Sequence, residues 1–169
     1  MSGTSRSRVF LSLGSNLGDR PALLRAAREA LAALPATRLV AASRVYETAP
    51  QDRRDQPAFL NQVVCLETAL RPPDLLSECR RIENEHGRVR ALRFGPRTLD
   101  VDILLFQDVE SDDPELTLPH PRLRQRAFVL VPLAEVWGWA RGMPGLDVAA
   151  LAGGLARDQA VEPYDGPEA

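Results

Sequence analysis

The sequence predicts an α+β fold in which helices cover an antiparallel sheet. Stretches of alternating apolar residues, typical of half-buried strands, are interspersed with stretches in which apolar residues recur with the helical period. Their order is strand, helix, strand, strand, helix, strand. The chain has 169 residues, of which 44% are hydrophobic, which is enough for one proper core. We therefore expect a single domain over residues 1–169, with its core at about 8–137.

In the first half of the chain, prolines and glycines mark where the predicted elements begin and end. Pro21 suits the first turn of a helix, and Gly14 and Gly18 suit the turn before it. The predicted elements are a strand at 8–14, a turn at 14–19, a helix at 21–34, strands at 37–47 and 59–70, and a polar loop at 48–57 between those two strands.

The second half begins with a helix that opens at Pro72 and stops at Gly87. The elements predicted after it are a strand at 99–106, an acidic loop at 108–115, a short edge strand at 116–118, a turn at 119–122, helices at 126–136 and 149–155, and a frayed tail at 162–169. Pro132 should kink the first of these helices or start a new turn. The six elements up to residue 106 form a ferredoxin-like βαββαβ core, and the last two helices form a C-terminal helical extension.

The strand at 99–106 carries the candidate chemistry. Alternation places Leu99, Val101, Ile103 and Leu105 on an apolar face that must be buried, and Asp100, Asp102, Leu104 and Phe106 on the other face. Residues two apart on a strand lie roughly 6.5 Å apart along it, so both carboxylates can reach one cluster of cations. Two like charges this close need compensation, and Mg²⁺ supplies it by binding carboxylate oxygens together with water and substrate phosphates.

Arginines precede this strand in a loop that contains Gly95 and Pro96. The segment 88–106 holds four arginines against two aspartates, and the four are Arg88, Arg90, Arg93 and Arg97. Each guanidinium is a planar fork that matches phosphate oxygens, so the loop and the strand suggest a polyphosphate held from both sides. All 21 basic residues are arginine, which excludes a P-loop lysine, a protein-kinase lysine and a lysine Schiff base. A GC-rich genome is an alternative origin of this bias.

A second interpretation competes with the phosphate site. On the Asp-Val-Asp triplet alone, two aspartates on solvated surface, neutralised by arginines in exposed ion pairs, are the better interpretation. The buried opposite face and the arginine-rich approach favour the phosphate site. The role of Asn61 is also open, because its side chain lies either in solvent at the start of a strand or in a pocket, where an amide can read the edge of a heterocycle.

Bulk properties exclude several classes of protein. The net charge of −2 argues against a general nucleic-acid binder. No stretch approaches the roughly 20 apolar residues that span a bilayer, and the polar residues 1–8 do not begin a signal peptide. Cys65 and Cys79 have neither the spacing of a zinc site nor the number for a disulfide framework, so we expect two buried thiols in a cytoplasmic protein.

Several blocks of the sequence, taken together, resemble a known family. They are Leu13-Gly14-Ser15-Asn16-Leu17-Gly18, Tyr46-Glu47-Thr48, Gln56-Pro57-Ala58-Phe59-Leu60-Asn61, Gly95-Pro96-Arg97-Thr98-Leu99-Asp100-Val101-Asp102, and Leu118-Pro119-His120-Pro121-Arg122 with Arg126-Ala127-Phe128. Their order and spacing, over about residues 9–135, resemble those of the 6-hydroxymethyl-7,8-dihydropterin pyrophosphokinases of folate biosynthesis. The block that ends in Asp-Val-Asp is the most specific.

The resemblance implies a ferredoxin-like α+β core and a reaction that moves the terminal two phosphates of ATP, as one unit, to the hydroxymethyl oxygen of the pterin, leaving AMP. It implies that Asp100 and Asp102 bind two Mg²⁺ ions, which bridge the phosphates and the attacking hydroxyl. Positioning and charge stabilisation would then supply most of the acceleration, and Asp102 or the metal-bound hydroxyl itself would ease removal of the proton. We expect a cytoplasmic monomer that acts on these small molecules, without nucleic acid or membrane.

The resemblance also implies roles residue by residue. The catalytic residues would be Asp100, Asp102, Arg88 and Arg97; those that bind ATP would be Arg88, Arg90, Arg97, Ile103, Thr117, His120 and Arg126; those that bind the pterin would be Thr48, Ala49, Phe59, Asn61 and Phe128. Phe59 and Phe128 would sandwich the flat ring, although core packing explains each of them better when taken alone. Glu83 matches a family position near the active site, whereas on pattern alone its default is the surface beside the buried helix stripe.

The chain departs from the family's pattern at three places. Phe59 stands where some members have tyrosine, Phe94 stands where some have tryptophan, and residues 51–55 lack a glycine that is common there. Two rivals remain. A ferredoxin-like binding module with surface aspartates would show no Mg²⁺-dependent ATP binding, and a two-metal phosphohydrolase would release phosphate without pterin.

Overall fold

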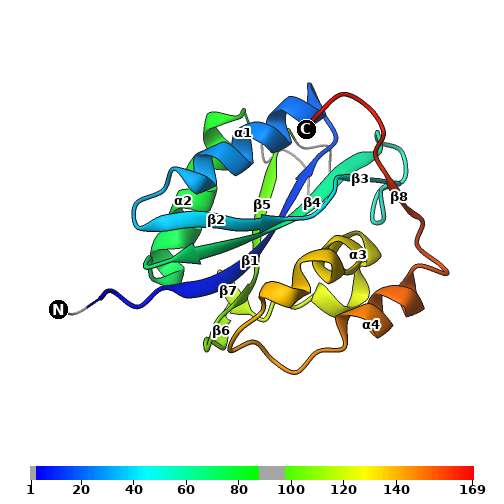
Figure 1. Cartoon of the computed structure of the whole chain (residues 1–169). Coiled ribbons are helices and arrows are strands. Elements are labelled where there is room, and N and C mark those ends of the chain that lie inside the picture. The colour runs from blue at the N-terminus through cyan, green and yellow to red at the C-terminus, as the bar shows by residue number, and fades with distance from the viewer. Residues whose placement is uncertain (1–2, 88–97) are drawn as a thin grey trace.

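The computed structural model describes residues 3–87 and 98–169. Its centre is a six-stranded antiparallel sheet of order β5-β1-β4-β3-β8, in which β2 also pairs with β4 (Figure 1). The elements are β1 (Ser7–Ser15), α1 (Arg20–Ala32), β2 (Thr37–Ala42), β3 (Tyr46–Thr48), β4 (Phe59–Thr68), α2 (Pro72–Glu85), β5 (Asp100–Phe106), β6 (Ser111–Asp113), β7 (Leu116–Leu118), α3 (Ala127–Val136), α4 (Val148–Leu155) and β8 (Val161–Pro163). The predicted ferredoxin-like core and the C-terminal helices are therefore confirmed.

Helices cover both faces of the sheet (Figure 1). On one face, alternate residues of β1 such as Val9 and Leu11 pack against Leu24 of α1 and Ile82 of α2. On the other face, Phe10 of β1 joins Val63 and Cys65 of β4 in a second cluster with the apolar side of α3, and α4 packs on α3. A strand buried on both faces has few polar positions, which explains the continuous apolar run of β4.

The strand predicted at 37–47 is divided into β2 and β3. Between them, Ser43 pairs with β4 through its own atoms, because its backbone N–H donates to the Val63 carbonyl at 2.9 Å and its Oγ accepts the Val63 N–H at 3.0 Å. The Ser43 hydroxyl thus takes the place of one backbone acceptor between the two strands. A side chain that competes with the backbone for hydrogen bonds in this way interrupts a strand.

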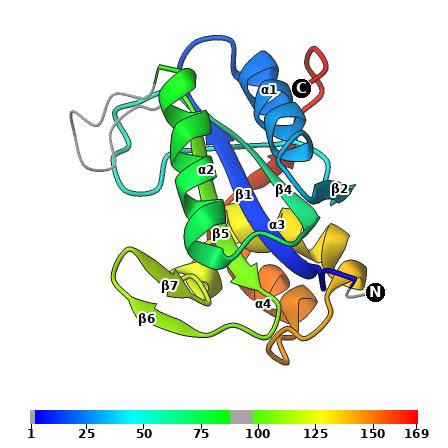
Figure 2. The same cartoon turned by 90° about the vertical axis from the view of Figure 1, so that its left-hand side faces the viewer.

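Two other segments are more ordered than the sequence predicts. The acidic loop contains β6, which pairs with β7 in a hairpin beside the lower end of β5 (Figure 2). Residues Val161–Pro163, at the start of the tail expected to fray, form β8 and pair with β3. Strand β8 pairs with β3, which is distant in the chain, and β6 pairs with β7, which follows it. Because these partners decide whether the strands form, neither strand leaves a strong local signal in the sequence.

The alternation predicted for β5 holds from Leu99 to Leu104 and is wrong for Leu105 and Phe106. Phe10 of β1 pairs with Leu105 and the next residue pairs with Ile103, so Leu104 is the extra residue of a β-bulge. Leu104 and Leu105 consequently both pack in the cluster with α3, whereas Phe106 packs in the cluster with α1 and α2. The bulge lies after the two aspartates and leaves their shared face unchanged.

Both cysteines are buried free thiols, as predicted. Burial raises the pKa of Cys65 to about 11 and also raises the pKa of Cys79, so neither thiol is reactive near neutral pH. Within residues 3–87 and 98–169, each helix is too short or too polar to cross a bilayer.

Candidate active site

The two aspartates of β5 lie in register with the small residues of β1. Asp100 pairs with Gly14 and Asp102 pairs with Ser12, and on the far side of β1, Gly14 pairs with Asn61 of β4. Paired residues of neighbouring strands point to the same face, so both carboxylates share a face with the Asn61 amide. Asp100 is buried and Asp102 is half-buried, which excludes the interpretation of both as freely solvated surface.

A first cavity, the Asn61 pocket, opens over this row of residues. It is lined by Ser12, Gly14, Thr48, Ala49, Gln51, Asp52, Gln56, Phe59, Asn61, Asp100, Asp102, Arg126 and Phe128. Gly14 leaves room at its floor, because a Cβ there would lie 3.2 Å from Asn61 Oδ1 and would push the amide aside by a few tenths of an ångström. Phe128 reaches this pocket from α3, and the guanidinium carbon of Arg126 lies 5.4 Å from the centre of its ring.

The side chain of Asn61 is buried in this pocket, which settles the alternative left open by the sequence. Its Nδ2 donates a hydrogen bond to Thr48 Oγ1 at 2.7 Å. This bond orients the amide so that Oδ1 lies on the side of Gly14 and Phe59. A buried amide oriented by its neighbour can read hydrogen-bond donors and acceptors on a ligand's edge.

A second cavity, the His120 pocket, lies on the other side of Asp102. Its lining comes from α2, from β5, from the β6–β7 hairpin and from the turn after β7, and consists of Leu76, Val101, Asp102, Ile103, Pro114, Glu115, Leu116, Thr117, His120 and Pro121. Ile103, Thr117 and His120, three of the residues predicted to bind ATP, therefore lie in the same cavity. Asp102 lines both pockets and stands between them.

The imidazole of His120 is neutral near physiological pH. Burial, together with the neighbouring Arg126 and Arg122, lowers its pKa to about 4. Its Nδ1 accepts the backbone N–H of Arg122 at 3.2 Å, so the ring proton is on Nε2. His120 is also anchored through its own backbone N–H, which donates to the Leu104 carbonyl at 2.8 Å. The neutral ring thus offers one N–H donor.

Glu83 of α2 is a residue whose position the sequence pattern missed. It is buried, and its Oε1 accepts the backbone N–H of Val101 at 2.9 Å. That N–H lies between the two aspartates, so Glu83 holds the strand that carries them. Assigning Glu83 to the helix surface was wrong. The spacing held a signal, because Glu83 follows the buried Cys79 by four residues and thus lies on the same face of the helix.

The glycine-rich turn after β1 supports the loop over the Asn61 pocket. Asn16 is buried, and its Nδ2 donates to Gln56 Oε1 and to the Pro57 carbonyl, both at 3.0 Å. Arg20 adds a hydrogen bond from Nη1 to the Ala58 carbonyl at 2.9 Å. The turn predicted at 14–19 therefore has a structural role, because it holds one rim of the pocket.

The remaining predicted residues divide between the described and undescribed parts of the chain. The Asn61 pocket is lined by four further residues that were predicted to bind the pterin, Thr48, Ala49, Phe59 and Phe128. It is also lined by Arg126, which was predicted to bind ATP. Arg88, Arg90, Arg93 and Arg97, together with Phe94, lie outside the described residues.

The aspartate pair fits a hard divalent cation. Over residues 3–87 and 98–169, no third carboxylate, imidazole or thiolate joins the pair in a cluster that would hold a metal by itself. Two carboxylates beside open cavities are typical of Mg²⁺, which takes its remaining ligands from water and substrate phosphates. The donor set thus fits Mg²⁺ better than zinc, which favours histidine and cysteine.

The fold and the site define a ferredoxin-like α+β protein with an acidic pair that fits a divalent cation, beside two cavities, the class expected of a phosphotransferase. The model of the family described as 7,8-dihydro-6-hydroxymethylpterin-pyrophosphokinase (HPPK) matches residues 10–138. The chain belongs to this family, which confirms the resemblance predicted from its sequence.

Similar proteins carry the same assignment. The chain is 49% identical over 130 residues to the 2-amino-4-hydroxy-6-hydroxymethyldihydropteridine pyrophosphokinase of Methylorubrum extorquens, covering 77% of this chain and 82% of that protein. It is 51% identical over 129 residues to the enzyme of the same name from Pseudomonas aeruginosa, covering 76% and 80%. For the Bacillus subtilis enzyme the identity is 46% over 128 residues, covering 76% and 77%.

Among solved structures, the chain is similar in fold to Plasmodium falciparum HPPK-DHPS. The wild-type crystal structure gives a TM-score of 0.67 at 14% identity, covering 93% of this chain and 46% of that chain. This chain thus spans about half the length of that protein, and the likeness at such low identity shows the fold alone.

Proposed function

We propose that the chain transfers pyrophosphate from ATP to the hydroxymethyl group of 6-hydroxymethyl-7,8-dihydropterin, giving AMP and the pterin diphosphate in folate biosynthesis. Membership of the pyrophosphokinase family supports the reaction. The observation that carries the proposal for this chain is that Asp102 lines both cavities. A carboxylate at the boundary between two pockets lies where a pyrophosphoryl group would pass from a ligand in one pocket to a ligand in the other pocket.

The Asn61 pocket suits the pterin. Phe59 and Phe128 offer aromatic surface to a flat ring, and Asn61 Oδ1 accepts from a ring N–H while Thr48 keeps the amide in its orientation. Such a pocket discriminates strongly, because a ligand without the matching polar edge leaves the buried amide unsatisfied.

The His120 pocket suits the nucleotide. Ile103 and Thr117 provide a partly apolar wall, and the neutral His120 donates its Nε2–H to an acceptor on ATP. Arg126 lines the neighbouring pocket and lies close enough to affect the pKa of His120, so its charge acts at the junction of the two pockets. We further propose phosphate contacts for Arg88, Arg90 and Arg97.

Asp100 and Asp102 would hold two Mg²⁺ ions. When bound, the metal neutralises phosphate charge and makes the hydroxyl a better nucleophile. Glu83 holds the Val101 amide and thereby keeps the two carboxylates on one rigid strand. Asp102, or metal binding of the attacking hydroxyl itself, would ease removal of the proton from that hydroxyl. We also propose that the protein is a cytoplasmic monomer that acts without a macromolecular partner.

The test mixes the purified chain with ATP, Mg²⁺ and the pterin alcohol and separates the nucleotides formed. We expect AMP and pterin diphosphate in equal amounts, and no turnover when either Mg²⁺ or pterin is omitted. ADP in place of AMP would make the protein an ordinary kinase. Phosphate released without pterin would make it a phosphohydrolase.

A further inference from the structure

Helix α3 and strand β3 both contribute residues to the lining of the Asn61 pocket. Arg126 and Phe128 lie at the first turn of α3, and Thr48 is the last residue of β3. The width available to a flat ring therefore depends on how the start of α3 is held relative to the end of β3.

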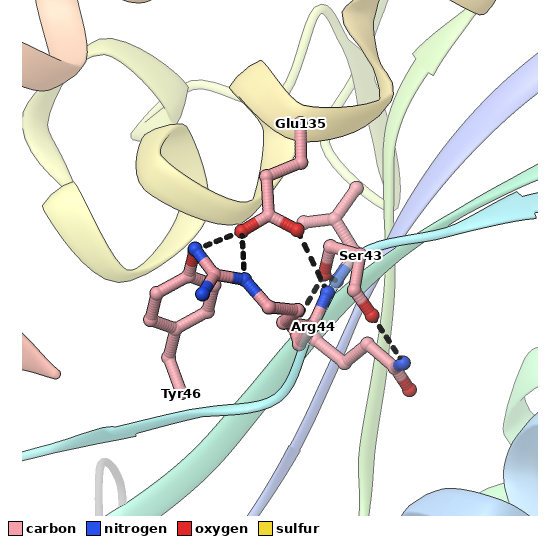
Figure 3. A network of polar contacts seen from close by, with 6 residues as sticks. Ser43, Arg44, Tyr46 and Glu135 are labelled. Atoms are coloured by element: carbon pink, nitrogen blue, oxygen red, sulfur yellow. Dashed lines mark hydrogen bonds and ion pairs between the residues drawn. The ribbon is translucent and has the colours of Figure 1, made fainter. Parts of the chain in front are cut away.

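Near the C-terminal end of α3, Glu135 links the helix to the segment that leads into β3. Its carboxylate accepts the Arg44 backbone N–H at 2.8 Å and the Arg44 Nε–H at 3.1 Å, and it also accepts the Tyr46 hydroxyl (Figure 3). Burial alone would raise the pKa of Glu135, but these hydrogen bonds outweigh it and lower the pKa, so the carboxylate is ionised. Glu135 lies about two helical turns from Phe128 and does not by itself place the aromatic ring.

The near end of α3 is tied by Gln159, a residue beyond the range matched by the family model. Its Oε1 accepts the Ala127 N–H at 2.9 Å, and its Nε2 donates to the Gln125 carbonyl at 3.0 Å. The N-cap residue of this helix, Arg126, provides no capping side chain. Gln159 thus satisfies a first-turn N–H that would otherwise lack a partner in the helix.

The same short segment then reaches β3. Two residues after Gln159, Val161 pairs with Thr48 in the β8–β3 ladder, and the Tyr164 N–H donates to the Val45 carbonyl at 2.9 Å. Gln159 and Val161 therefore connect the first turn of α3 to the last residue of β3 through a span of three residues, and neither residue lines the pocket.

We propose that Gln159 is a positioning residue for the pterin, because it holds Phe128 at a set distance from Thr48 through the short link to β8. The proposal rests on the proposed function for the identity of the ligand. It requires that loss of the two hydrogen bonds weakens pterin binding selectively, since the His120 pocket is built from other segments.

The test compares Gln159→Met, which keeps the length of the side chain and removes both hydrogen bonds, with wild type. We expect KM for the pterin to rise about tenfold, as two lost hydrogen bonds would allow, with kcat and KM for ATP within about twofold. Calorimetry with the pterin alcohol alone should show the same loss of affinity. Gln159→Glu keeps the acceptor for the Ala127 N–H and should raise KM for the pterin by only about threefold.

Gln107→Met is the matched control. Gln107 is half-buried like Gln159 and also binds a distant backbone, since its Oε1 accepts the Arg8 N–H at 2.9 Å, but it lies at the other end of β1. It should lower thermal stability to a similar degree and leave both KM values unchanged.

An unchanged KM for the pterin in Gln159→Met would overturn the proposal. The proposal would also be overturned if Gln159→Met changed all kinetic constants equally and Gln107→Met produced the same changes. If Gln159→Met fails to fold, Gln159→Glu decides, and a wild-type KM for the pterin in that variant refutes the proposal. Absence of AMP from wild type would instead reject the proposed function, which is established before any variant is measured.

Discussion

The two pockets that meet at Asp102 are built in different ways. The floor of the Asn61 pocket consists of residues in adjacent strands, and its buried amide is held by Thr48. The His120 pocket is walled by a hairpin whose tip is exposed and which is tied to α2 by an ion pair of 3.2 Å between exposed side chains, Arg80 and Glu115. Exposed ion pairs stabilise little, whereas buried hydrogen bonds in a sheet hold their geometry. The comparison indicates that the first pocket is held rigidly and selects its ligand through the buried amide, whereas the second pocket is held less firmly and can accommodate its ligand.

The largest effect is expected at the residue that the pockets share. Asp102→Asn removes a charge from the metal-binding pair, and kcat for AMP formation should fall by about 10³-fold, the scale of losing a pre-organised electrostatic group at a reacting centre. The melting temperature should stay near that of wild type, because Asp102 is only half-buried. Asp112→Asn, on the exposed β6, is the control and should keep full activity. A near-normal rate in Asp102→Asn would remove the basis of the comparison.

The next effect isolates the selective pocket. Asn61→Leu removes the buried amide and leaves the Thr48 hydroxyl without its donor, so kcat/KM for the pterin should fall by about 10²-fold. The dissociation constant for ATP, measured by calorimetry without pterin, should not change. Equal losses for both substrates would show that the pockets are not independent.

A smaller effect isolates the accommodating pocket. His120→Asn replaces the Nε2–H donor with a shorter side chain, and KM for ATP should rise about tenfold, the value of one to two hydrogen bonds. KM for the pterin should remain within about twofold. If the pterin constant rises instead, the assignment of the pockets to the two substrates is reversed.

The smallest effect concerns stability and pH. The pKa of His120 is about 4 in the folded protein against an ordinary value of 6.5, so between these values the unfolded chain binds a proton that the folded chain does not. Stability present above about pH 6.5 is therefore lost as the pH falls toward 4. His120→Asn should lose less stability than wild type over this window in urea unfolding. Parallel curves for wild type and His120→Asn would show that His120 does not titrate differently on folding.

The sequence was sufficient wherever the deciding interactions are local. The period of two along β5 placed Asp100 and Asp102 on one face, and the proline and glycine signals placed α1 and α2 within two residues of their observed ends. The blocks around Asn61, Asp100 and His120 also identified, through resemblance, residues that the fold brings to the two pockets.

The sequence failed where a distant partner decides. The bulge at Leu104 is a property of the register between β1 and β5, so alternation within one strand does not reveal it. The division of residues 37–47 depends on Ser43 binding to Val63, twenty positions away. Glu83 lies on the buried face of α2 by its spacing from Cys79, but a carboxylate is accommodated there through the hydrogen bond from the distant Val101 N–H. In each case, pairing with a segment distant in the chain decides the local structure.

Strand β8, at one edge of the sheet, affects how readily copies of the chain associate in crowded solution. A bare edge would present N–H and carbonyl groups to any extended segment nearby and so invite aggregation. Here β8 is only three residues long, its Glu162 is charged, and Pro163 has no N–H to offer. The strand that braces one wall of a ligand pocket thereby also makes that margin of the sheet a poor template for another chain.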